Sequence, residues 1–270
     1  MKEHKTESLS FGHTTTIPDL STEIPMHSHA AYELYYFLSG NCDYTVEGVS
    51  NHLESGTLLA IRAGETHRPV LRDTSPYERI TIHFLPEALD SLDPSHRLLT
   101  PFDDHPLGRN NLYSPVITRE SGIADCFSSI QQTKGDAYDL HIRVQTMFFR
   151  ILCILSDLHK EQSATSALAD PLVMAIIDYI NLHLTAPLSL ETICREFFIS
   201  KSHLQRLFRH STGTTLWNYI TLKRLTFAQK QIRDGISAAQ AAADSGFPDY
   251  STFSAPTKTV SVTRQRQNKA

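Results

Sequence analysis

Apolar and polar residues form short β-type runs over the first third of the chain. The clearest runs are Tyr32–Gly40, Cys42–Gly48, Thr57–Gly64 and Arg79–Leu85, and each ends at a glycine or just before a proline. Short runs rich in β-branched and aromatic residues, separated by turn signals, predict an antiparallel sandwich or barrel. The region from about residue 9 to residue 85 is therefore expected to form a β-domain.

Helical spacing follows the β-type runs. One helix is predicted over Arg119–Thr133 and another over Tyr138–Lys160. In the latter, apolar residues recur at alternating steps of four and three, as in a coiled-coil seam: Leu140, Val144, Met147, Ile151, Ile154 and Leu158. The same helix has a second apolar face that can serve the core: Phe148, Phe149, Leu152 and Leu155. The stripe is thus a candidate seam for a homodimer, with packing on the β-domain as the alternative.

The C-terminal part carries two helix-turn-helix patterns in series. The first lies between Pro187 and Gly213, and the second opens within Gly235–Phe253. A single predicted helix over Leu216–Arg233 joins them. The second helix of each pattern begins with small polar residues, and such a helix can enter a DNA major groove with its N-terminal residues facing base edges. Two patterns in series favour a DNA-binding domain.

The reading helix of the first pattern separates core positions from exposed ones. Leu204 and Phe208 are predicted to face the core. Gln and Arg side chains make bidentate contacts with adenine and guanine edges, so Gln205 and Arg206 are the candidates for base contacts. Arg209 lies further along and is placed to reach phosphate. The predicted DNA-contacting residues are Ser200 (also a suitable N-cap), Lys201, Ser202, His203, Gln205, Arg206 and Arg209, with Asp249, Tyr250, Ser251 and Thr252 in the second pattern.

Charge is divided unevenly along the chain. Residues 171–270 hold 12 Lys and Arg against 6 Asp and Glu, whereas residues 1–170 hold 13 against 23. A basic C-terminal part suits contact with nucleic acid by that part alone.

Composition excludes several classes of protein. With 40% apolar and 20% charged residues, the chain has an ordinary globular composition. No apolar run is long enough to span a membrane, and the N-terminal stretch lacks the apolar core of a signal peptide. The four cysteines lie far apart without a CxxC pair, as expected of reduced thiols. We therefore expect a cytoplasmic protein without a membrane partner.

Histidines in the β-domain have the spacing of a metal site. His27 and His29 are two residues apart and Glu33 is four further on, so all three share one face if the strand continues through them. His67 would complete a set of three histidines and one carboxylate suited to a divalent transition metal. Histidines that hydrogen-bond within a barrel mouth are the alternative. Because small barrels hold ligands in their mouths, the predicted pocket for a small polar effector, such as a sugar, comprises His27, His29, Tyr32, Glu33, Tyr35 and His67.

This spacing resembles the two motifs of the cupin superfamily. The first motif matches at His27, His29, Glu33 and Gly40, and the second at Gly56, Gly64 and His67. Arg62 stands where cupins usually have proline, and Leu71 where an asparagine is usual. The resemblance implies a cupin β-barrel at the N-terminus.

The stretch from Ser189 to Phe253 resembles the DNA-binding domain of AraC-type transcription regulators. The resemblance includes Ser200, Leu204, Phe208, Gly213, Tyr219, Ile220, Arg224, Leu225, Ala228, Ala242, Gly246, Phe247, Ser251 and Phe253. It implies an α+β multidomain protein, with a sensing barrel over 1–118, a helical dimerisation segment over 119–160, a linker over 161–170 and an all-α double helix-turn-helix domain over 171–270. It also implies a dimeric bacterial regulator that binds double-stranded DNA and responds to a small molecule, often for an operon of sugar use.

The match ends after Phe253. The family continues with a basic recognition helix and a Gly-x-Thr/Ser-Pro turn, whereas Ala255 and Thr257 occupy the expected Arg and Phe positions. Pro256 falls inside the second recognition helix, where proline costs about 3 kcal/mol or more. A shift of reading frame near residue 254 is one hypothesis, and a diverged but active C-terminus is the other. Under both, the second unit is expected to bind DNA poorly.

Two other functions compete with a ligand-responsive DNA-binding regulator. The first is a cupin metalloenzyme, an isomerase or dioxygenase, that uses the histidines and Glu33. It leaves the basic paired-helix part unexplained. The second is a variant that dimerises without binding DNA, which the altered tail favours. The regulator accounts for most of the chain, so we expect a protein that is not an enzyme.

Overall fold

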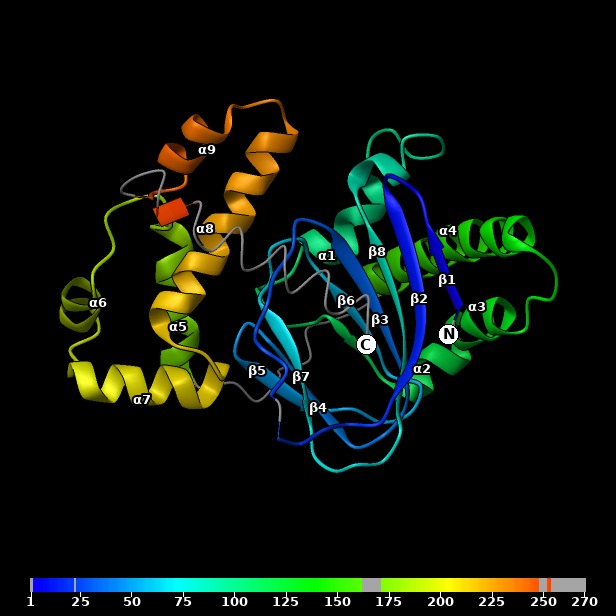
Figure 1. Ribbon diagram of the computed structural model, residues 1–270, viewed down its shortest axis with the longest axis horizontal. Helices are drawn as coiled ribbons and strands as arrows, with labels where there is room; N and C mark the ends of the chain where they lie inside the picture. The colour runs from blue at the N-terminus through cyan, green and yellow to red at the C-terminus, as the bar shows by residue number, and fades with distance from the viewer. Residues whose placement is uncertain (1, 22, 162–170, 248–251, 254–270) are drawn as a thin grey trace. The chain divides into compact units, whose positions relative to one another are not determined.

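The computed structural model describes residues 2–21, 23–161, 171–247 and 252–253 (Figure 1). The chain divides into two compact units, Met1–Pro25 with Ala31–Leu168, and Met26–Ala30 with Ala169–Ala270. All four cysteines are free thiols. Over the described residues, no helix is both long and apolar enough to cross a membrane.

Two antiparallel sheets form the β-part of the N-terminal unit. The larger sheet has the order β1-β2-β8-β3-β6-β9 and the smaller has the order β5-β4-β7. The strands are β1 (Lys2–Lys5), β2 (Leu9–Thr16), β3 (Tyr32–Ser39), β4 (Cys42–Val46), β5 (Val49–His52), β6 (Leu58–Ile61), β7 (His67–Leu71), β8 (Tyr77–Phe84) and β9 (Leu112–Tyr113). Between β4 and β5 the chain turns through Glu47 and Gly48, whose φ angles of 46° and 80° suit a two-residue hairpin.

Strand β3 lies inside the larger sheet and is buried on both faces. Because side chains alternate along a strand, one set faces a core shared with the helices: Tyr32, Leu34 and Tyr36. The other set faces the smaller sheet: Glu33, Tyr35 and Phe37. The space between the sheets is filled by the side chains of this second set and by those of the facing strands, including Tyr44 and Tyr77.

Helices cover the outer face of the larger sheet. Short pieces come first, η1 (Pro86–Ala88), η2 (Arg97–Leu99) and α1 (Thr100–Asp103), followed by α2 (Pro115–Glu120), α3 (Ile123–Gln131) and α4 (Ala137–Glu161). Ser114 caps α2 by accepting a hydrogen bond from the Ile117 N–H. The two longest, α3 and α4, share one hydrophobic core with β2, β3 and β8.

The apolar stripe that was predicted as a dimer seam lies in this core. Val144 and Ile151 are fully buried and Met147 is 8% exposed, while the remaining members of the stripe pack partly buried against the same core: Leu140, Ile154 and Leu158. Phe148 is also buried there, so both apolar faces of α4 serve the core. The a/d spacing did not separate these cases because a broad core-facing stripe contains the same positions. The central residues of the stripe therefore pack in the core of this unit, and dimerisation through this segment stays a prediction.

The C-terminal unit is helical. Its helices are α5 (Pro171–Leu182), α6 (Leu190–Glu196), α7 (Lys201–Thr212), α8 (Leu216–Arg233) and α9 (Ala238–Asp244). Four of them begin at a hydroxyl side chain that accepts a hydrogen bond from the backbone N–H three residues on: Ser189, Ser200, Thr215 and Ser237. One hydrophobic core lies among α5 to α8, and a smaller one lies between the second half of α8 and α9.

Arg224 fastens α8 to the loop between α5 and α6. Its Nε donates to the Leu184 carbonyl at 2.9 Å and its Nη2 to the Ala186 carbonyl at 2.8 Å. Gly246 packs against the same place. A Cβ there would lie 2.9 Å from the Thr185 carbonyl oxygen and 3.1 Å from Arg224 Cζ, at a φ of +83° that disfavours other residues. The loop that precedes α6 is thus held by Arg224 of α8 and by Gly246, which follows α9.

Candidate nucleic-acid interface

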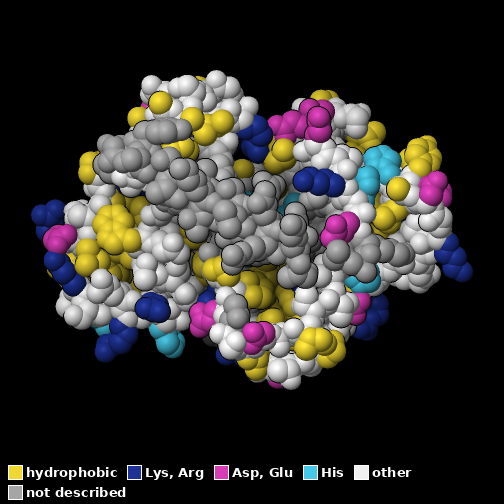
Figure 2. Space-filling view, in the orientation of Figure 1, with side chains coloured by type: hydrophobic (Ala, Val, Ile, Leu, Met, Phe, Trp, Pro, Cys, Tyr) yellow, Lys and Arg dark blue, Asp and Glu magenta, His cyan; other side chains and the backbone are white. Residues whose placement is uncertain are grey.

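Helix α7 presents a polar face to solvent. Leu204 and Phe208 are fully buried, whereas the residues predicted to contact DNA on this helix are all exposed: Lys201, Ser202, His203, Gln205, Arg206 and Arg209. Ser200 accepts the hydrogen bond of the His203 N–H at 3.3 Å and so caps the helix. Figure 2 shows Lys, Arg and His side chains gathered at the edge formed by α6 and α7. The face that was predicted to read DNA is therefore accessible in the C-terminal unit.

Three of these side chains have partners within the unit. Lys201 forms an ion pair with Glu191 of α6, and the hydrogen bond to Glu191 raises the pKa of the Lys201 ammonium. Arg206 Nη2 lies 3.4 Å from His203 Nδ1. Because Lys201 ties the start of α7 to α6, it positions the reading helix as well as adding positive charge.

The turn between α6 and α7 contains a strained residue. Phe198 has a φ of 53° and is 94% exposed. The Ile199 N–H donates to the Cys194 carbonyl at 3.0 Å, which closes α6 with a six-to-one hydrogen bond. Phe198 thus stands at the position after the helix end where glycine is preferred. A bulky residue in the left-handed region costs of order 1–3 kcal/mol.

Phe198→Gly is expected to stabilise the C-terminal unit. Relief of the left-handed strain exceeds the entropic cost of glycine, and little packing is lost because the ring is exposed, so we expect a gain of about 1 kcal/mol. Urea unfolding followed through Trp217, the one tryptophan of the chain, measures it. Phe198→Ala removes the same ring but keeps the Cβ, and an equal gain in that variant would show that strain is not the cause.

The second pattern is described only in part. Thr252 is exposed and Phe253 is 4% exposed, in the smaller core with Phe247. Three predicted DNA-contacting residues lie outside the described residues: Asp249, Tyr250 and Ser251. The tail from residue 254, which contains Pro256, also lies outside the described residues. The weak DNA binding predicted for the second helix-turn-helix pattern therefore stays a prediction.

A carboxylate and two histidines meet in the N-terminal unit. Glu33 Oε2 lies 3.2 Å from His67 Nε2 and 3.3 Å from His83 Nε2. Glu33 and His67 are buried at 3% and 0% exposure. Sequence reasoning brought Glu33 together with His67 but missed His83. The signal was in the alternation of Arg79–Leu85, because His83 is the direct neighbour of Glu33 across β3 and β8.

The hydrogen bonds of His67 define its chemistry. Its Nδ1 lies 2.8 Å from the Glu65 carbonyl, which only accepts, so Nδ1 carries a proton and Nε2 faces Glu33. Burial lowers the pKa of His67, but the hydrogen bond and negative charge of Glu33 outweigh it and leave the pKa raised. Among the described residues, the group whose ligand atoms could together hold a metal ion is His29, Glu33 and His83, which shares two residues with this cluster but does not include His67. Metal binding stays a prediction.

Strand β3 begins at Tyr32, so it does not extend back through His27 and His29 to give the shared face that was expected. These two histidines belong to Met26–Ala30, which groups with the C-terminal unit, and their ring centroids are 6.2 Å apart. Tyr32 lies on the helix-facing side of β3, where its hydroxyl donates to Asp103 at 3.1 Å.

Arg62, which stands at a usual proline position, has a structural role. Its guanidinium donates to three backbone carbonyls, those of Phe102 at 2.7 Å, Asp103 at 2.7 Å and His105 at 2.6 Å. Because guanidinium groups offer donors in a fixed fork, one side chain holds this loop against β6. At this position, where cupins usually have proline, the arginine therefore holds the loop through its hydrogen bonds.

Two fully buried carboxylates, Glu47 and Glu65, lie beside the cluster of Glu33, His67 and His83. Glu65 accepts hydrogen bonds from the Gly108 N–H at 2.8 Å and the Arg62 N–H at 3.0 Å, and Glu47 accepts one from the Thr66 N–H at 2.7 Å. Burial, and then the negative charge of Glu47, raise the pKa of Glu65 to about 7. The Glu65 carboxyl therefore keeps its proton to a higher pH than an exposed glutamate does.

Stability of the N-terminal unit is expected to fall as pH rises from 5 to 8. The folded-state pKa of Glu65, about 7, lies above its ordinary value of 4.5, so the protonated carboxyl stabilises the fold at low pH and this contribution is lost through the folded pKa. The loss is roughly 3 kcal/mol. Urea denaturation at several pH values measures it, with Glu65→Gln as the comparison because an amide does not titrate. If the free energy of unfolding changed equally with pH in the two proteins, Glu65 would not be the group responsible for the loss of stability.

Comparisons with known families agree with both units. The chain matches the cupin domain family over residues 14–83 and the helix-turn-helix domain family over residues 193–261. These matches confirm the β-rich cupin region followed by helices and the helical DNA-binding region. The second match extends past Phe253, where the sequence pattern was judged to end.

Several transcription regulators are similar to the chain. The HTH-type transcriptional activator RhaR of Mannheimia succiniciproducens is 23% identical over 232 residues, which are 85% of this chain and 81% of RhaR. The regulatory protein SoxS of Salmonella typhimurium is 32% identical over 84 residues, which are 31% of this chain and 78% of SoxS. The crystal structure of the AraC-like transcriptional activator CuxR is similar with 18% identity, 88% of this chain and 82% of CuxR covered, and a TM-score of 0.36.

Proposed function

Because the chain belongs to the AraC family of transcription regulators, we propose that it recognises a specific operator through α7 and that a small metabolite controls this binding. An operon for a sugar or a similar metabolite is the proposed target. As a member of a family of DNA-binding regulators, the chain is not an enzyme.

The exposed face of α7 is the observation that carries the proposal. Gln205 and Arg206 lie in the first half of the helix and are exposed, while Leu204 and Phe208 anchor it in the core. Residues near the start of a recognition helix reach base edges. Arg209, one turn later, is proposed to contact phosphate.

Substitutions on α7 test this division of roles. Gln205→Ala and Arg206→Ala are each expected to relax preference at one operator position by about 1–3 kcal/mol. Arg209→Ala is expected to weaken binding to all sequences and to lower the slope of log affinity against log salt by about one. Selection of binding sites from a random DNA pool, followed by salt titrations on the best site, measures both effects.

A charge-matched control separates the reading face from general attraction. Lys230→Ala removes one positive charge from the exposed side of α8 in the same unit. It is expected to leave base preference unchanged. If Gln205→Ala and Arg206→Ala also select the parent operator with unchanged preference, then α7 does not read the bases.

The cluster of Glu33, His67 and His83 is proposed to have a structural role. Glu33 and His83 belong to the larger sheet and His67 to the smaller one. The three side chains therefore fasten the two sheets to one another through the contacts of the Glu33 carboxylate with the two imidazoles.

A further inference from the structure

The space between the two sheets leaves little room for an effector. Tyr35, Tyr44 and Tyr77 are each at most 2% exposed. The hydroxyls of Tyr35 and Tyr77 are 2.5 Å apart, and the Tyr35 and Tyr44 rings are 4.5 Å apart between centroids. A ligand between the sheets would have to displace these packed rings, which favours a site elsewhere on the N-terminal unit.

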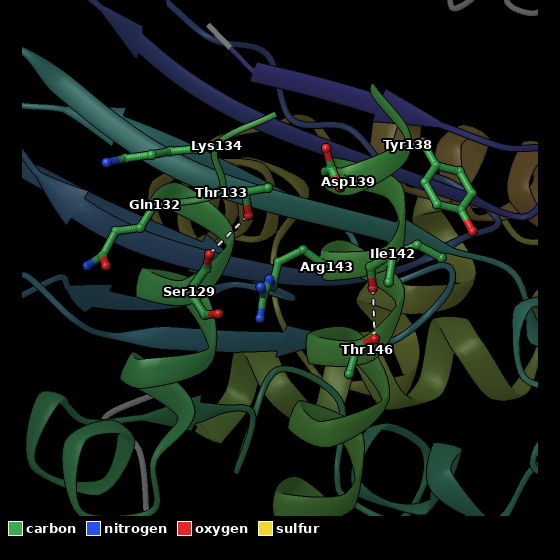
Figure 3. Close-up of a pocket in the computed structure, with 9 residues that line it drawn as sticks. All are labelled: Ser129, Gln132, Thr133, Lys134, Tyr138, Asp139, Ile142, Arg143 and Thr146. Carbon is green, nitrogen blue, oxygen red and sulfur yellow. Dashed lines mark hydrogen bonds between the residues drawn. The ribbon is translucent and has the colours of Figure 1, made fainter. Parts of the chain in front are cut away.

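A groove on the helical side of this unit has the size of a ligand site. It lies between the end of α3 and the first half of α4, with a volume of about 690 Å³. Small-molecule sites commonly enclose about 300–1,000 Å³. The side chains that line it are Ser129, Gln132, Thr133, Lys134, Tyr138, Asp139, Ile142, Arg143 and Thr146 (Figure 3).

Arg143 and Lys134 are the two cations among the residues that line this groove. Figure 3 shows the Arg143 guanidinium extending from α4 into the space between the two helices, toward Ser129. Asp139, four residues earlier, is in the position to pair with it. The Asp139 carboxylate instead accepts the Asp136 N–H at 3.1 Å. Within the described part of the chain, Arg143 has no ion pair.

The rest of the lining combines polar and apolar groups. Tyr138 and Ile142 are 69% and 46% exposed, unusually high for an aromatic and a branched aliphatic side chain. Thr133 and Thr146 donate their hydroxyl hydrogens to the backbone carbonyls of Ser129 and Ile142, at 3.1 Å and 2.8 Å. Figure 3 shows Tyr138 and Ile142 extending from the side of α4 opposite to Arg143, so the groove has an arginine fork at one side and apolar side chains at the other. Such a lining matches a carboxylate joined to an extended apolar body, because guanidinium binds carboxylate through two parallel hydrogen bonds.

We propose that this groove between α3 and α4, outside the barrel, binds a small organic carboxylate with an apolar ring. Arg143 pairs with the carboxylate, and Tyr138 and Ile142 cover the ring. The idea rests on the proposed function only in regarding this ligand as the effector of the regulator. Ligand binding by the free protein and operator binding are separate measurements, so either can fail without the other.

Calorimetric titration of the full chain with biphenyl-4-carboxylate tests the site. We expect binding by the parent protein, and about tenfold or greater weakening in Arg143→Gln, because a hydrogen-bonded charge pair is lost. Arg143→Lys keeps the charge but not the fork, so its affinity is expected to fall between the two. Arg150→Gln removes the same charge from an exposed position seven residues along α4 and is expected to bind as the parent does.

A neutral amide of the same shape distinguishes the contribution of the carboxylate to binding from that of the ring. Biphenyl-4-carboxamide is expected to bind the parent protein about as weakly as the acid binds Arg143→Gln. Circular dichroism of each variant checks that the fold is kept, as expected for substitutions at exposed positions. The proposal is overturned if the acid does not bind the parent protein at millimolar concentration, or if Arg143→Gln and Arg150→Gln bind it equally.

Discussion

Ile151→Glu is expected to unfold the N-terminal unit. Ile151 is fully buried in the core that α3 and α4 share with the larger sheet. The change removes the packing of a branched side chain and places a carboxylate where it has no water, which together cost at least about 5 kcal/mol. That is comparable with the whole stability of many domains. Calorimetry should show the loss of the cooperative transition of this unit.

The same experiment distinguishes core packing from a dimer seam. Cys153→Glu places the same charge on the exposed side of α4, two residues further on, and is expected to change stability by less than about 0.5 kcal/mol. A seam residue would behave differently, since its glutamate would yield a folded monomer. Sedimentation of a well-folded, monomeric Ile151→Glu protein would therefore refute the core assignment.

Arg224→Ala is expected to destabilise the C-terminal unit by roughly 3 kcal/mol, because two charge-assisted hydrogen bonds are lost and the Leu184 and Ala186 carbonyls lose their partner. Arg224→Lys should recover only part of this, since an ammonium lacks the fork that reaches both carbonyls. Urea unfolding monitored by Trp217 fluorescence measures the effect in this unit.

An exposed cation on the same helix is the control for Arg224. Lys230→Ala removes a positive charge of α8 from the solvent side and is expected to shift the urea midpoint little. Equal shifts in Arg224→Ala and Lys230→Ala would mean that charge, rather than the anchoring of the loop, is the origin of the effect.

The sequence predicted the main elements because their signals are local. Ser200 as a cap and the alternation of buried and exposed positions along α7 depend only on neighbouring residues, and both are confirmed. Strands β1 and β9 were missed since each is too short to show a period. The spacing left the role of α4 open between a dimer seam and core packing, because it reveals which residues are apolar but not which surface covers them.

The site was less predictable because it depends on contacts between distant strands. Glu33 and His83 are neighbours only through the register of β3 and β8, which local spacing does not specify. The motif placed His27 and His29 on the strand of Glu33, but β3 begins only at Tyr32, after both histidines. The groove around Arg143 carries no sequence motif, since it is created by the packing of two helices and by the turn of Asp139 toward Asp136.

The small core between α8 and α9 limits the stability of the second helix-turn-helix pattern against local unfolding. Of its six described residues, three are alanines: Ala228, Ala241 and Ala242. Alanine buries little apolar area, so this core opens at a lower free energy than the larger core beside it, and the amides of α9 should exchange with solvent faster than those of α7. When the competent form is populated only a fraction of the time, apparent affinity falls by that fraction. For a DNA site that contacts both helix-turn-helix patterns, the free energy needed to order the second pattern then lowers the apparent affinity. Binding of such an operator is therefore expected to stabilise the folded form of α9.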